Sequence, residues 1–493
     1  MPGVILCADI GTSSLKAAFI GFDGKLAAFS REPYQRGVHS RSIYTDEWER
    51  AFSRALHNLY AQFPACAPEA VCISGNGPTL APVTVSGETL PPLYWHDGRI
   101  APPETAGAPA PRSFFLPRAA WLKQHAPAEY EKTGVFLSPH EWLSHRLGAP
   151  PQAVLPSAAF EPYFWDDEQC RLFALDRGKF PPFATMGSVI GTVSAQAAHD
   201  FGAGGGGIKS GTPIVAGGTD FITALIGTGT LRPGDACDRA GSSEGINVCA
   251  AGADPGEVLA QSANAAARTG AGAGLRVLPH VREGLWNVGK VIPTSGSFFE
   301  RYRAAVQETQ GYAQQLDELL HSFKNNGMVM YDTSIFRNLP FLPISNEPFP
   351  HIANRADGIA LGRQVLCAMG FAVKAAAGAL GDSGFQIRQM RVSGGQAKNS
   401  QWNQLKADIT GIELLIPKIP DGELAGNAVI AAVALGAASS LEQAADRMIH
   451  IQEVFQPRRE AADFWNEQYA LFQETNASEM NASQLETSVL SKK

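Results

Sequence analysis

The chain opens with V-I-L-C-A-D-I-G-T-S-S-L-K at residues 4–16, an apolar run followed by a glycine and three hydroxyl residues. The apolar run predicts a β-strand, and Leu15–Phe22 predicts a second strand after the turn. The D-G pair at residues 23–24 leads into a third strand, Lys25–Phe29, so we expect an antiparallel meander. A glycine with hydroxyl residues in such a turn can direct successive backbone N–H groups at a phosphate.

Asp9 ends the first strand and is the first candidate metal ligand, either directly or through water. Mg²⁺ suits this position because it takes few carboxylates and keeps several waters. Lys16 could reach a phosphate oxygen from the second strand. The backbone contacts to phosphate would come from Gly11, Thr12, Ser13 and Ser14. An ordinary polar hairpin turn is the alternative interpretation of this motif.

A second strand that ends in an acid follows more than two hundred residues later. Thr212–Asp220 is apolar and closes with G-G-T-D, whose two glycines let a substrate approach the backbone closely. Asp220 can accept the proton of an attacking hydroxyl, as an aspartate does in phosphoryl transfer. Its position also fits a cap of the helix predicted at Phe221–Gly227.

The segment A-G-S-S-E-G-I-N-V-C-A-A-G at residues 240–252 repeats the strand–turn–strand pattern of the opening. A second phosphate turn would consist of Gly241, Ser242 and Ser243. We pair Thr212–Asp220 with Val4–Asp9 as the first strands of two copies. The repeat predicts a duplicated fold with a cleft between its halves.

A third turn, S-G-G-Q-A-K-N-S at residues 393–400, follows the strand predicted at Gln389–Val392. A strand, two glycines and a helix make a platform for a flat nucleotide base. The candidate contacts are Gly394, Gly395, Gln396 and Asn399. A plain strand–helix turn is the alternative.

Three other site types are disfavoured by the spacing of their residues. G-S-S-E-G at residues 241–245 matches a serine-hydrolase elbow with Ser243 as nucleophile, but that elbow needs a following helix and the next residues look extended. His140 and His145 are five positions apart, so a helix would not place them on one face as in a zinc protease. No Gly-Lys pair precedes Ser or Thr, which excludes a P-loop.

The bulk composition argues for a globular protein in a reducing compartment. A formal net charge of −7 gives no general attraction to nucleic acid or to anionic lipid. The seven cysteines form no C-x-x-C pair and are expected to be small buried residues. The apolar windows Val365–Leu380 and Leu424–Leu435 are short enough to be core helices. We expect a cytoplasmic protein with a small-molecule partner, and a homodimer is one option for its oligomeric state.

Taken together and in this order, the motifs resemble those of the FGGY carbohydrate kinases of the actin-like ATPase superfamily, and more loosely their xylulokinase branch. D-I-G-T-S-S-L-K at residues 9–16 resembles the family's first phosphate turn, and G-S-S at residues 241–243 stands where the family usually has G-T-S. V-S-G-G-Q-A-K-N from residue 392 resembles its adenosine segment, and E-L-A-G-N-A-V-I-A-A from residue 423 resembles its late helix. The likeness covers nearly the whole chain.

The resemblance implies an α/β fold with two ribonuclease-H-like (actin-like ATPase) domains and an ATP/sugar cleft between them. Residues 1–248 would hold the sugar, the first phosphate turn and Asp220 as the catalytic base, and residues 249–493 would hold adenosine. The implied cofactors are ATP and Mg²⁺, with the metal near Asp9 and Asp220. The implied sugar contacts, from I-S-G-N, W-H-D-G-R and G-G-T-D, are Asn76, Gly77, Trp95, Asp97 and Asp220.

The departures from the family pattern lie on the sugar side. Typical xylulokinases carry Q-M-H-G after I-S-G, whereas this chain has N-G-P-T at residues 76–79. Phe221 stands where a polar residue often follows the catalytic aspartate. Because fewer hydrogen-bonding groups remain near the sugar, the substrate should differ from that of typical xylulokinases. We expect a ketose, with xylulose as one candidate, or a polyol. An actin-like ATP- or sugar-binding protein without turnover is the alternative function.

Overall fold

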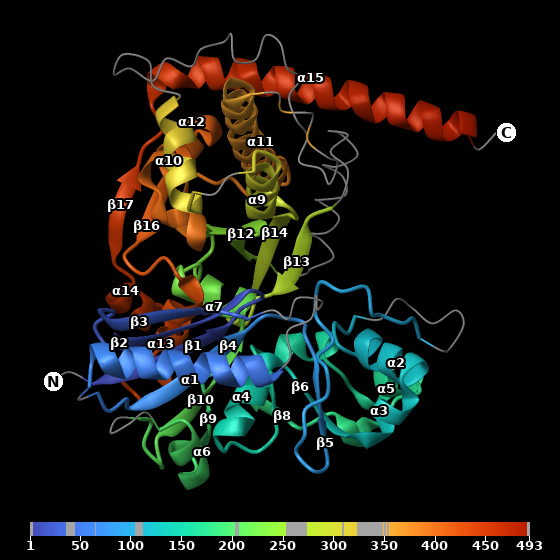
Figure 1. Ribbon diagram of the computed structural model, residues 1–493, viewed down its shortest axis with the longest axis vertical. Helices are drawn as coiled ribbons and strands as arrows, with labels where there is room; N and C mark the ends of the chain where they lie inside the picture. Colours follow the sequence, from blue (N-terminus) through green and yellow to red (C-terminus); the bar gives the residue numbers. More distant parts are fainter. Residues whose placement is uncertain are drawn as a thin grey trace. The chain divides into compact units, whose positions relative to one another are not determined.

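The computed structural model describes residues 3–35, 45–64, 66–103, 112–202, 207–252, 274–307, 310–322, 349, 352 and 354–490, with side chains described up to residue 474. The chain divides into two compact units, which are drawn in Figure 1 and described separately below. Unit 1 comprises Met1–Arg232, Pro279–Leu285 and Asp421–His450. Unit 2 comprises Pro233–Leu278, Trp286–Pro420 and Ile451–Lys493.

Unit 1 is built on a six-stranded sheet in which the predicted meander is confirmed. The strand order is β3 (Leu26–Pro33), β2 (Ser14–Gly21), β1 (Val4–Ile10), β4 (Ala70–Gly75), β10 (Pro213–Thr219) and β9 (Val189–Thr192). β1, β4 and β10 run parallel, so their carboxyl ends meet at one edge. Asp9 pairs with Ser74, and Ser74 pairs with Gly218, which places the acidic strand ends of the sequence side by side.

Helices cover both faces of this sheet. α1 (Thr45–Gln62) packs on β2 and β3, as Figure 1 shows, and it buries Trp48, Phe52 and Leu56 at helical spacing. α13 (Gly422–Ala434) packs on β1, β4 and β10 and is buried along most of its length. The burial of whole strands such as V-I-L-C-A-D-I follows from this two-sided cover.

The remaining elements of unit 1 are short. They are β5 (Ala81–Thr84), α2 (Leu116–His125), α3 (Pro127–Lys132), β6 (Thr133–Leu137), α4 (Pro139–Leu147), β7 (Ala153–Leu155), η1 (Ala158–Tyr163), α5 (Asp167–Leu172), η2 (Arg177–Lys179), β8 (Phe183–Thr185), α6 (Ala195–Asp200), α7 (Asp220–Gly227) and α14 (Leu441–Met448). Of these, α7 matters most for the site, because Asp220 is its first residue.

Helices α7 and α13 meet backbone to backbone at glycines. A Cβ atom on Gly426 would lie 1.9 Å from the carbonyl oxygen of Thr223, and one on Gly227 would lie 1.9 Å from that of Gly422. No side chain larger than hydrogen fits at either position without moving a helix. The contact therefore fixes where α7, and with it Asp220, lies against α13.

We expect Gly426→Ala to lower the free energy of unfolding by roughly 1–3 kcal/mol, because the added methyl group overpacks this contact. Gly378→Ala, in α11 (Arg355–Asp382), is the matched control: no atom lies within 4 Å of its added Cβ atom. That control should gain about 0.5–1 kcal/mol from the better helix propensity of alanine. Urea unfolding of both variants checks this, and equal stability of the two would contradict the packing argument.

Unit 2 contains a seven-stranded sheet that repeats the strand arrangement around β1. Its order is β13 (Arg276–Pro279), β14 (Leu285–Ile292), β12 (Glu244–Ala251), β11 (Ala236–Ala240), β15 (Gln389–Ser393), β16 (Glu413–Pro417) and β17 (Ile451–Phe455). β11 forms an antiparallel hairpin with β12 and runs parallel to β15, as β1 does with β2 and β4. The fold is therefore duplicated.

The predicted pairing of the two copies is wrong in one respect. We paired Thr212–Asp220 with Val4–Asp9, but β10 bonds to β4 and belongs to the same sheet as β1. The counterpart of β1 is β11, because each forms a hairpin across a glycine–hydroxyl turn. Asp9 and Asp220 are thus neighbours within unit 1 and not equivalent residues of two repeats.

In the described part of unit 2, five helices are found together with the short η4 (Gly395–Lys398). They are α9 (Ser295–Ala305), α10 (Tyr312–Ser322), α11, α12 (Ser400–Thr410) and α15 (Arg459–Leu490). Within the part of the chain that is described, α11 alone is long and apolar enough to cross a membrane, and 61% of its apolar window is buried in the protein. It packs on α9, α10 and α12, as expected of a core helix.

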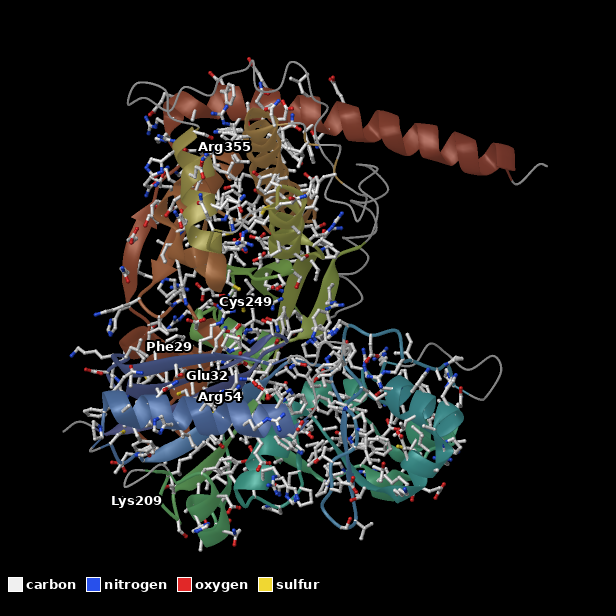
Figure 2. All side chains as sticks on the ribbon, viewed as in Figure 1. Phe29, Glu32, Arg54, Lys209, Cys249 and Arg355 are labelled. Carbon is white, nitrogen blue, oxygen red and sulfur yellow. The ribbon has the colours of Figure 1, made fainter. Side chains whose placement is uncertain are left out.

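The cysteines behave as the composition predicts. All seven are buried, among them Cys249 of β12, which is labelled in Figure 2. Burial raises the pKa of Cys66 and of Cys170 to about 11. These thiols are therefore protonated at neutral pH and act as small apolar side chains.

Candidate active site

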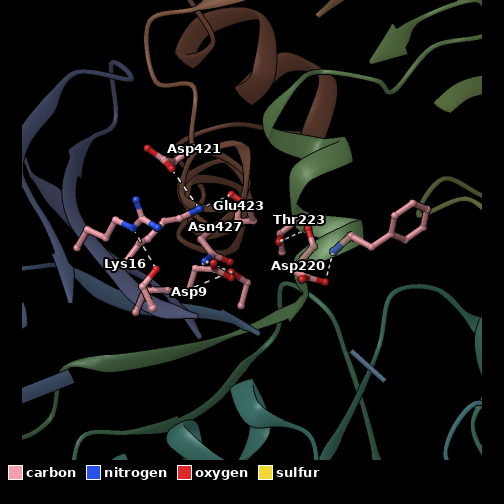
Figure 3. Close-up of polar contacts among 12 residues, drawn as sticks. Asp9, Lys16, Asp220, Thr223, Asp421, Glu423 and Asn427 are labelled. Carbon is pink, nitrogen blue, oxygen red and sulfur yellow. Dashed lines mark hydrogen bonds and ion pairs between the residues drawn. The ribbon is translucent and has the colours of Figure 1, made fainter. Parts of the chain in front are cut away.

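Acidic side chains surround Lys16 in unit 1 (Figure 3). The Lys16 Nζ atom lies 3.1 Å from Asp421 Oδ1 and 3.4 Å from Glu423 Oε2, at the start of α13. Burial alone would lower the pKa of Lys16, but Glu423, Asp421 and Asp9 together raise it above its ordinary value. Lys16 is therefore a cation that α13 holds in place, and its predicted contact with phosphate stays a prediction.

Asp9 is almost completely buried beside this lysine, with 2% of its surface exposed. The Ser74 hydroxyl donates a hydrogen bond to Asp9 Oδ1 at 2.9 Å. Burial raises the pKa of Asp9 to about 8, helped by the Glu423 and Asp220 carboxylates and opposed by Lys16 and Ser74. A further positive charge at this position would favour the ionised carboxylate.

Asn427 of α13 determines which way the Ser74 hydroxyl points. Its Nδ2 atom donates to the Ala8 carbonyl at 2.9 Å and to Ser74 Oγ at 3.0 Å. Because Ser74 accepts this bond, its own proton is available for Asp9. Gly217 lies close to β4, since a Cβ atom there would lie 1.9 Å from the Ile73 carbonyl oxygen, and it would also lie 3.2 Å from Asn427 Oδ1. Sequence reasoning missed Asn427, although an amide inside A-G-N-A-V-I-A-A was a usable signal.

Asp220 lies at the amino end of α7, where the helix dipole favours a carboxylate. Its Oδ1 atom accepts a hydrogen bond from the Phe221 backbone N–H at 2.7 Å. The alternative of a capping role is corrected: the cap residue is Thr219, and Asp220 is the first residue of the helix. The Asp220 side chain is only partly buried.

The predicted sugar-side residues Asn76 and Trp95 lie next to the turn at Gly11–Ser14, whereas Gly77 lies beside Thr219, and a Cβ atom on Gly77 would lie 2.8 Å from Thr219 Cγ2. Asn76 donates from Nδ2 to the Ile10 carbonyl at 2.9 Å and to the Gly11 carbonyl at 3.1 Å, and its side chain is fully buried. Trp95 donates from Nε1 to Thr12 Oγ1 at 3.3 Å and is 39% exposed. Asn76 thus braces the turn, whereas Trp95 presents an accessible ring.

Asp97 holds the W-H-D-G-R segment in a turn. Its Oδ2 atom accepts hydrogen bonds from the Tyr94 N–H at 2.9 Å and from Arg99 Nε at 3.0 Å. The buried Arg118, which the sequence did not suggest, donates to the carbonyl of Trp95 at 2.8 Å. Asp97 and Arg118 therefore fix the backbone that carries Trp95.

The acidic side chains of unit 1 fit Mg²⁺ better than a metal ion whose ligands all come from the protein. Among the described residues no group of three or more His, Cys, Asp or Glu side chains could hold a metal ion. Asp9 and Asp220 could supply oxygen ligands, and the raised pKa of Asp9, which burial causes first and the Glu423 and Asp220 carboxylates increase, would be offset by a cation. Mg²⁺ commonly uses one or two carboxylates together with water and phosphate.

In unit 2 the Gly241–Ser243 turn joins β11 to β12. The Gly241 carbonyl accepts hydrogen bonds from the Gly296 N–H at 3.2 Å and from Gln396 Nε2 at 3.2 Å. The Ser242 carbonyl accepts one from the Ser297 N–H at 3.0 Å. A strand follows Ser243, not a helix, so the elbow of a serine hydrolase is absent here.

The third predicted turn lies beside the second. Gly394 has a φ of +94°, and a Cβ atom there would lie 2.5 Å from the Ala240 carbonyl, so only glycine fits. Gly395 is exposed, but Gln396 is buried. Asn399 caps α12 by accepting from the Trp402 N–H at 2.9 Å, and its Nδ2 atom donates to Asp317 at 2.7 Å. Gln396 and Asn399 thus make protein contacts where base contacts were predicted.

A buried ion network lies beneath these turns. Lys406 Nζ is 2.6 Å from Asp238 Oδ2 and 2.6 Å from Glu244 Oε1, and all three side chains are fully buried. Ser295 also bonds to Glu244. Because Glu244 directly follows Ser243, the network anchors the second turn to α12.

Comparison with known proteins assigns this architecture. Residues 4–227 match the N-terminal domain of the FGGY family of carbohydrate kinases, and residues 354–435 match its C-terminal domain. A xylulose kinase of Staphylococcus epidermidis is 22% identical over 95% of this chain and 96% of its own length. An autoinducer-2 kinase of Yersinia enterocolitica is 23% identical over 70% of this chain and 65% of its own length.

A solved structure of glycerol kinase from Plasmodium falciparum with ADP has the same fold. It superposes with a TM-score of 0.73 at 15% identity, covering 97% of this chain and 98% of that one. The predicted two-domain α/β fold and the predicted resemblance are confirmed.

Proposed function

Because the chain belongs to the FGGY family of carbohydrate kinases, we propose that it transfers the γ-phosphate of ATP to a hydroxyl of a small sugar or polyol, with Asp220 as general base. One observation carries the proposal most directly. The parallel strands β1 and β10 deliver Asp9 and Asp220 to one sheet edge, where Lys16 and α13 complete a charged site. Such a site suits charge-rich phosphoryl transfer.

Asp220 would accept the proton of the attacking hydroxyl. The Phe221 N–H donates to one carboxylate oxygen and so helps to fix the orientation of the Asp220 side chain. Little covalent chemistry is required of the protein in phosphoryl transfer, so orientation of the hydroxyl and stabilisation of charge are its main contributions. A bound Mg²⁺ near Asp9 and Asp220 would supply positive charge against the phosphate oxygens.

The phosphates of ATP would contact two backbone turns. The first is Gly11–Ser14, with Lys16 beside it, and the second is Gly241–Ser243. Gly394 and Gly395 would lie near adenosine. This division assigns the sugar and the base to residues 1–248 and adenosine to residues 249–493.

The residues proposed to contact the sugar are compatible with several small sugars and polyols. The Asn76 amide donates its hydrogen bonds to backbone carbonyls, and Phe221 is apolar. Fewer side chains therefore remain to bind hydroxyl groups of the substrate. D-xylulose is the first candidate, because the relative matched over nearly its whole length is a xylulose kinase. We place the enzyme in the cytoplasm, without nucleic acid or membrane partners.

A coupled assay of ADP release over pentuloses, hexuloses, pentitols and glycerol tests the proposal. We expect ADP release to rise strongly with one class of these compounds. An ATP-binding protein without turnover would release no more ADP with any of them than without, which would contradict the proposal.

A further inference from the structure

Gln396 occupies the place where the sequence predicts a contact to the nucleotide base, yet only 4% of its surface is exposed. Its Nε2 atom donates to the Gly241 carbonyl at 3.2 Å and lies 3.3 Å from Ser295 Oγ. Its Oε1 atom accepts from Trp402 Nε1 at 3.0 Å. An indole N–H can only donate, so this bond fixes the orientation of the amide and directs Nε2 at Gly241.

The bond to Gly241 determines how the second turn presents its N–H groups. In a trans peptide the carbonyl of one residue and the N–H of the next point in opposite directions. Gln396 and Gly296 hold the Gly241 carbonyl, and Ser297 holds the Ser242 carbonyl. The N–H groups of Ser242 and Ser243 therefore point away from α9 and Gln396. Two successive N–H groups on one side make an anion-binding concavity.

The surroundings show that this orientation is built in. A Cβ atom on Gly296 would lie 2.3 Å from the Gly241 carbonyl, so a glycine is required for the approach of α9. Gln396 supplies a side-chain donor to a carbonyl of the Gly241–Ser243 turn. Gln396 is thus the side-chain part of a clamp whose other parts are backbone.

We propose that Gln396 is a positioning residue for nucleotide phosphate and makes no contact to the adenine base. The inference rests on the proposed use of ATP. Gln396 acts through Gly241. Without the Gln396 amide, the Gly241 carbonyl can rotate, and the N–H groups of Ser242 and Ser243 then no longer point to the same side. The affinity for ADP, which carries phosphates, should fall, whereas the affinity for adenosine should not change.

The experiment measures the affinities of ADP and adenosine by calorimetry in the presence of Mg²⁺. Gln396→Met keeps the length of the side chain and removes its hydrogen bonds with Gly241, Ser295 and Trp402. We expect its Kd for ADP to rise about 5- to 10-fold, the loss of about one hydrogen bond, with adenosine affinity unchanged. Gln315→Met replaces another buried glutamine, in α10, and should leave both affinities unchanged.

Gln396→Glu provides a second variant if the methionine protein folds poorly. It keeps the shape and the bond from Trp402, but a carboxylate cannot donate to Gly241, so ADP binding should again weaken selectively. Equal losses for ADP and adenosine would mean a base contact and would overturn the inference, as would unchanged ADP affinity in both variants. If the unaltered protein binds neither ligand, the use of ATP itself is contradicted.

Discussion

Asp220→Asn is expected to lower kcat by about 10²–10⁴-fold while the affinity for ATP stays close to that of the unaltered enzyme. Asparagine keeps the shape of the side chain and can still accept the Phe221 N–H, so the start of α7 should remain intact. It cannot take a proton from the attacking hydroxyl. The loss should therefore appear in turnover and not in nucleotide binding.

The matched control is Asp167→Asn, because Asp167 is the first residue of α5 as Asp220 is of α7. Its side chain is 83% exposed, and it pairs only loosely with Arg177. Activity should be unaffected. Steady-state kinetics with the best sugar of the screen, together with calorimetry of ATP binding, decides the matter. Turnover of Asp220→Asn near that of the unaltered enzyme would refute the assignment of the base.

Lys406→Met should be the most destabilising single change in unit 2. It leaves Asp238 and Glu244 fully buried without the cation that lies 2.6 Å from each. Removing one partner of a buried ion pair typically costs roughly 3–5 kcal/mol, because a buried charge is left uncompensated. Lys374→Met in α11 is the control, because both partners of Lys374, the Ile409 carbonyl and the Asn466 side chain, are uncharged. This variant therefore leaves no carboxylate of an ion pair behind.

The effect of Lys406→Met should depend on pH. Burial, with Glu244 next, raises the pKa of Asp238 to about 8, and Lys406 opposes this rise. The ordinary value for an unfolded chain is about 3.9, so between these values the folded state binds more protons and loses stability as pH rises. Because Lys406 lowers this pKa, its removal should extend the loss of stability to higher pH. Urea unfolding should therefore show a larger deficit at about pH 9 than at about pH 7.

Two outcomes would count against this account of the network. One is a deficit of Lys406→Met that is no larger than that of Lys374→Met. The other is a deficit that shrinks as pH rises. Conversely, adding Asp238→Asn and Glu244→Gln to Lys406→Met should recover much of the stability, because no buried charge then remains.

Local features of the fold could be predicted from the sequence. The opening meander and the two glycine–hydroxyl turns are encoded by short apolar runs and turn residues, and the structure has them. The partners of the strands could not be read in the same way. Thr212–Asp220 resembles Val4–Asp9 in composition, but its place in the sheet depends on hydrogen bonds to β4.

The site was predictable to the extent that its residues follow strand ends. Asp9 and Asp220 were singled out because an acid after an apolar strand is a local pattern, and the structure brings both to one sheet edge. The partners of Lys16 were missed, since Asp421 and Glu423 are some four hundred residues away in the chain. The contacts of Gln396 with Trp402 and Gly241 could not be predicted, because they are a property of packing that no local pattern shows.

The central claim is that the γ-phosphate of ATP goes to a sugar hydroxyl. ³¹P NMR of the enzyme with ATP, Mg²⁺ and D-xylulose, or with the best compound of the screen, follows the phosphate directly. We expect a phosphomonoester signal and ADP signals to grow in equal amounts, and only when the sugar is present. ADP that accumulates with inorganic phosphate, regardless of added sugar, would contradict the claim.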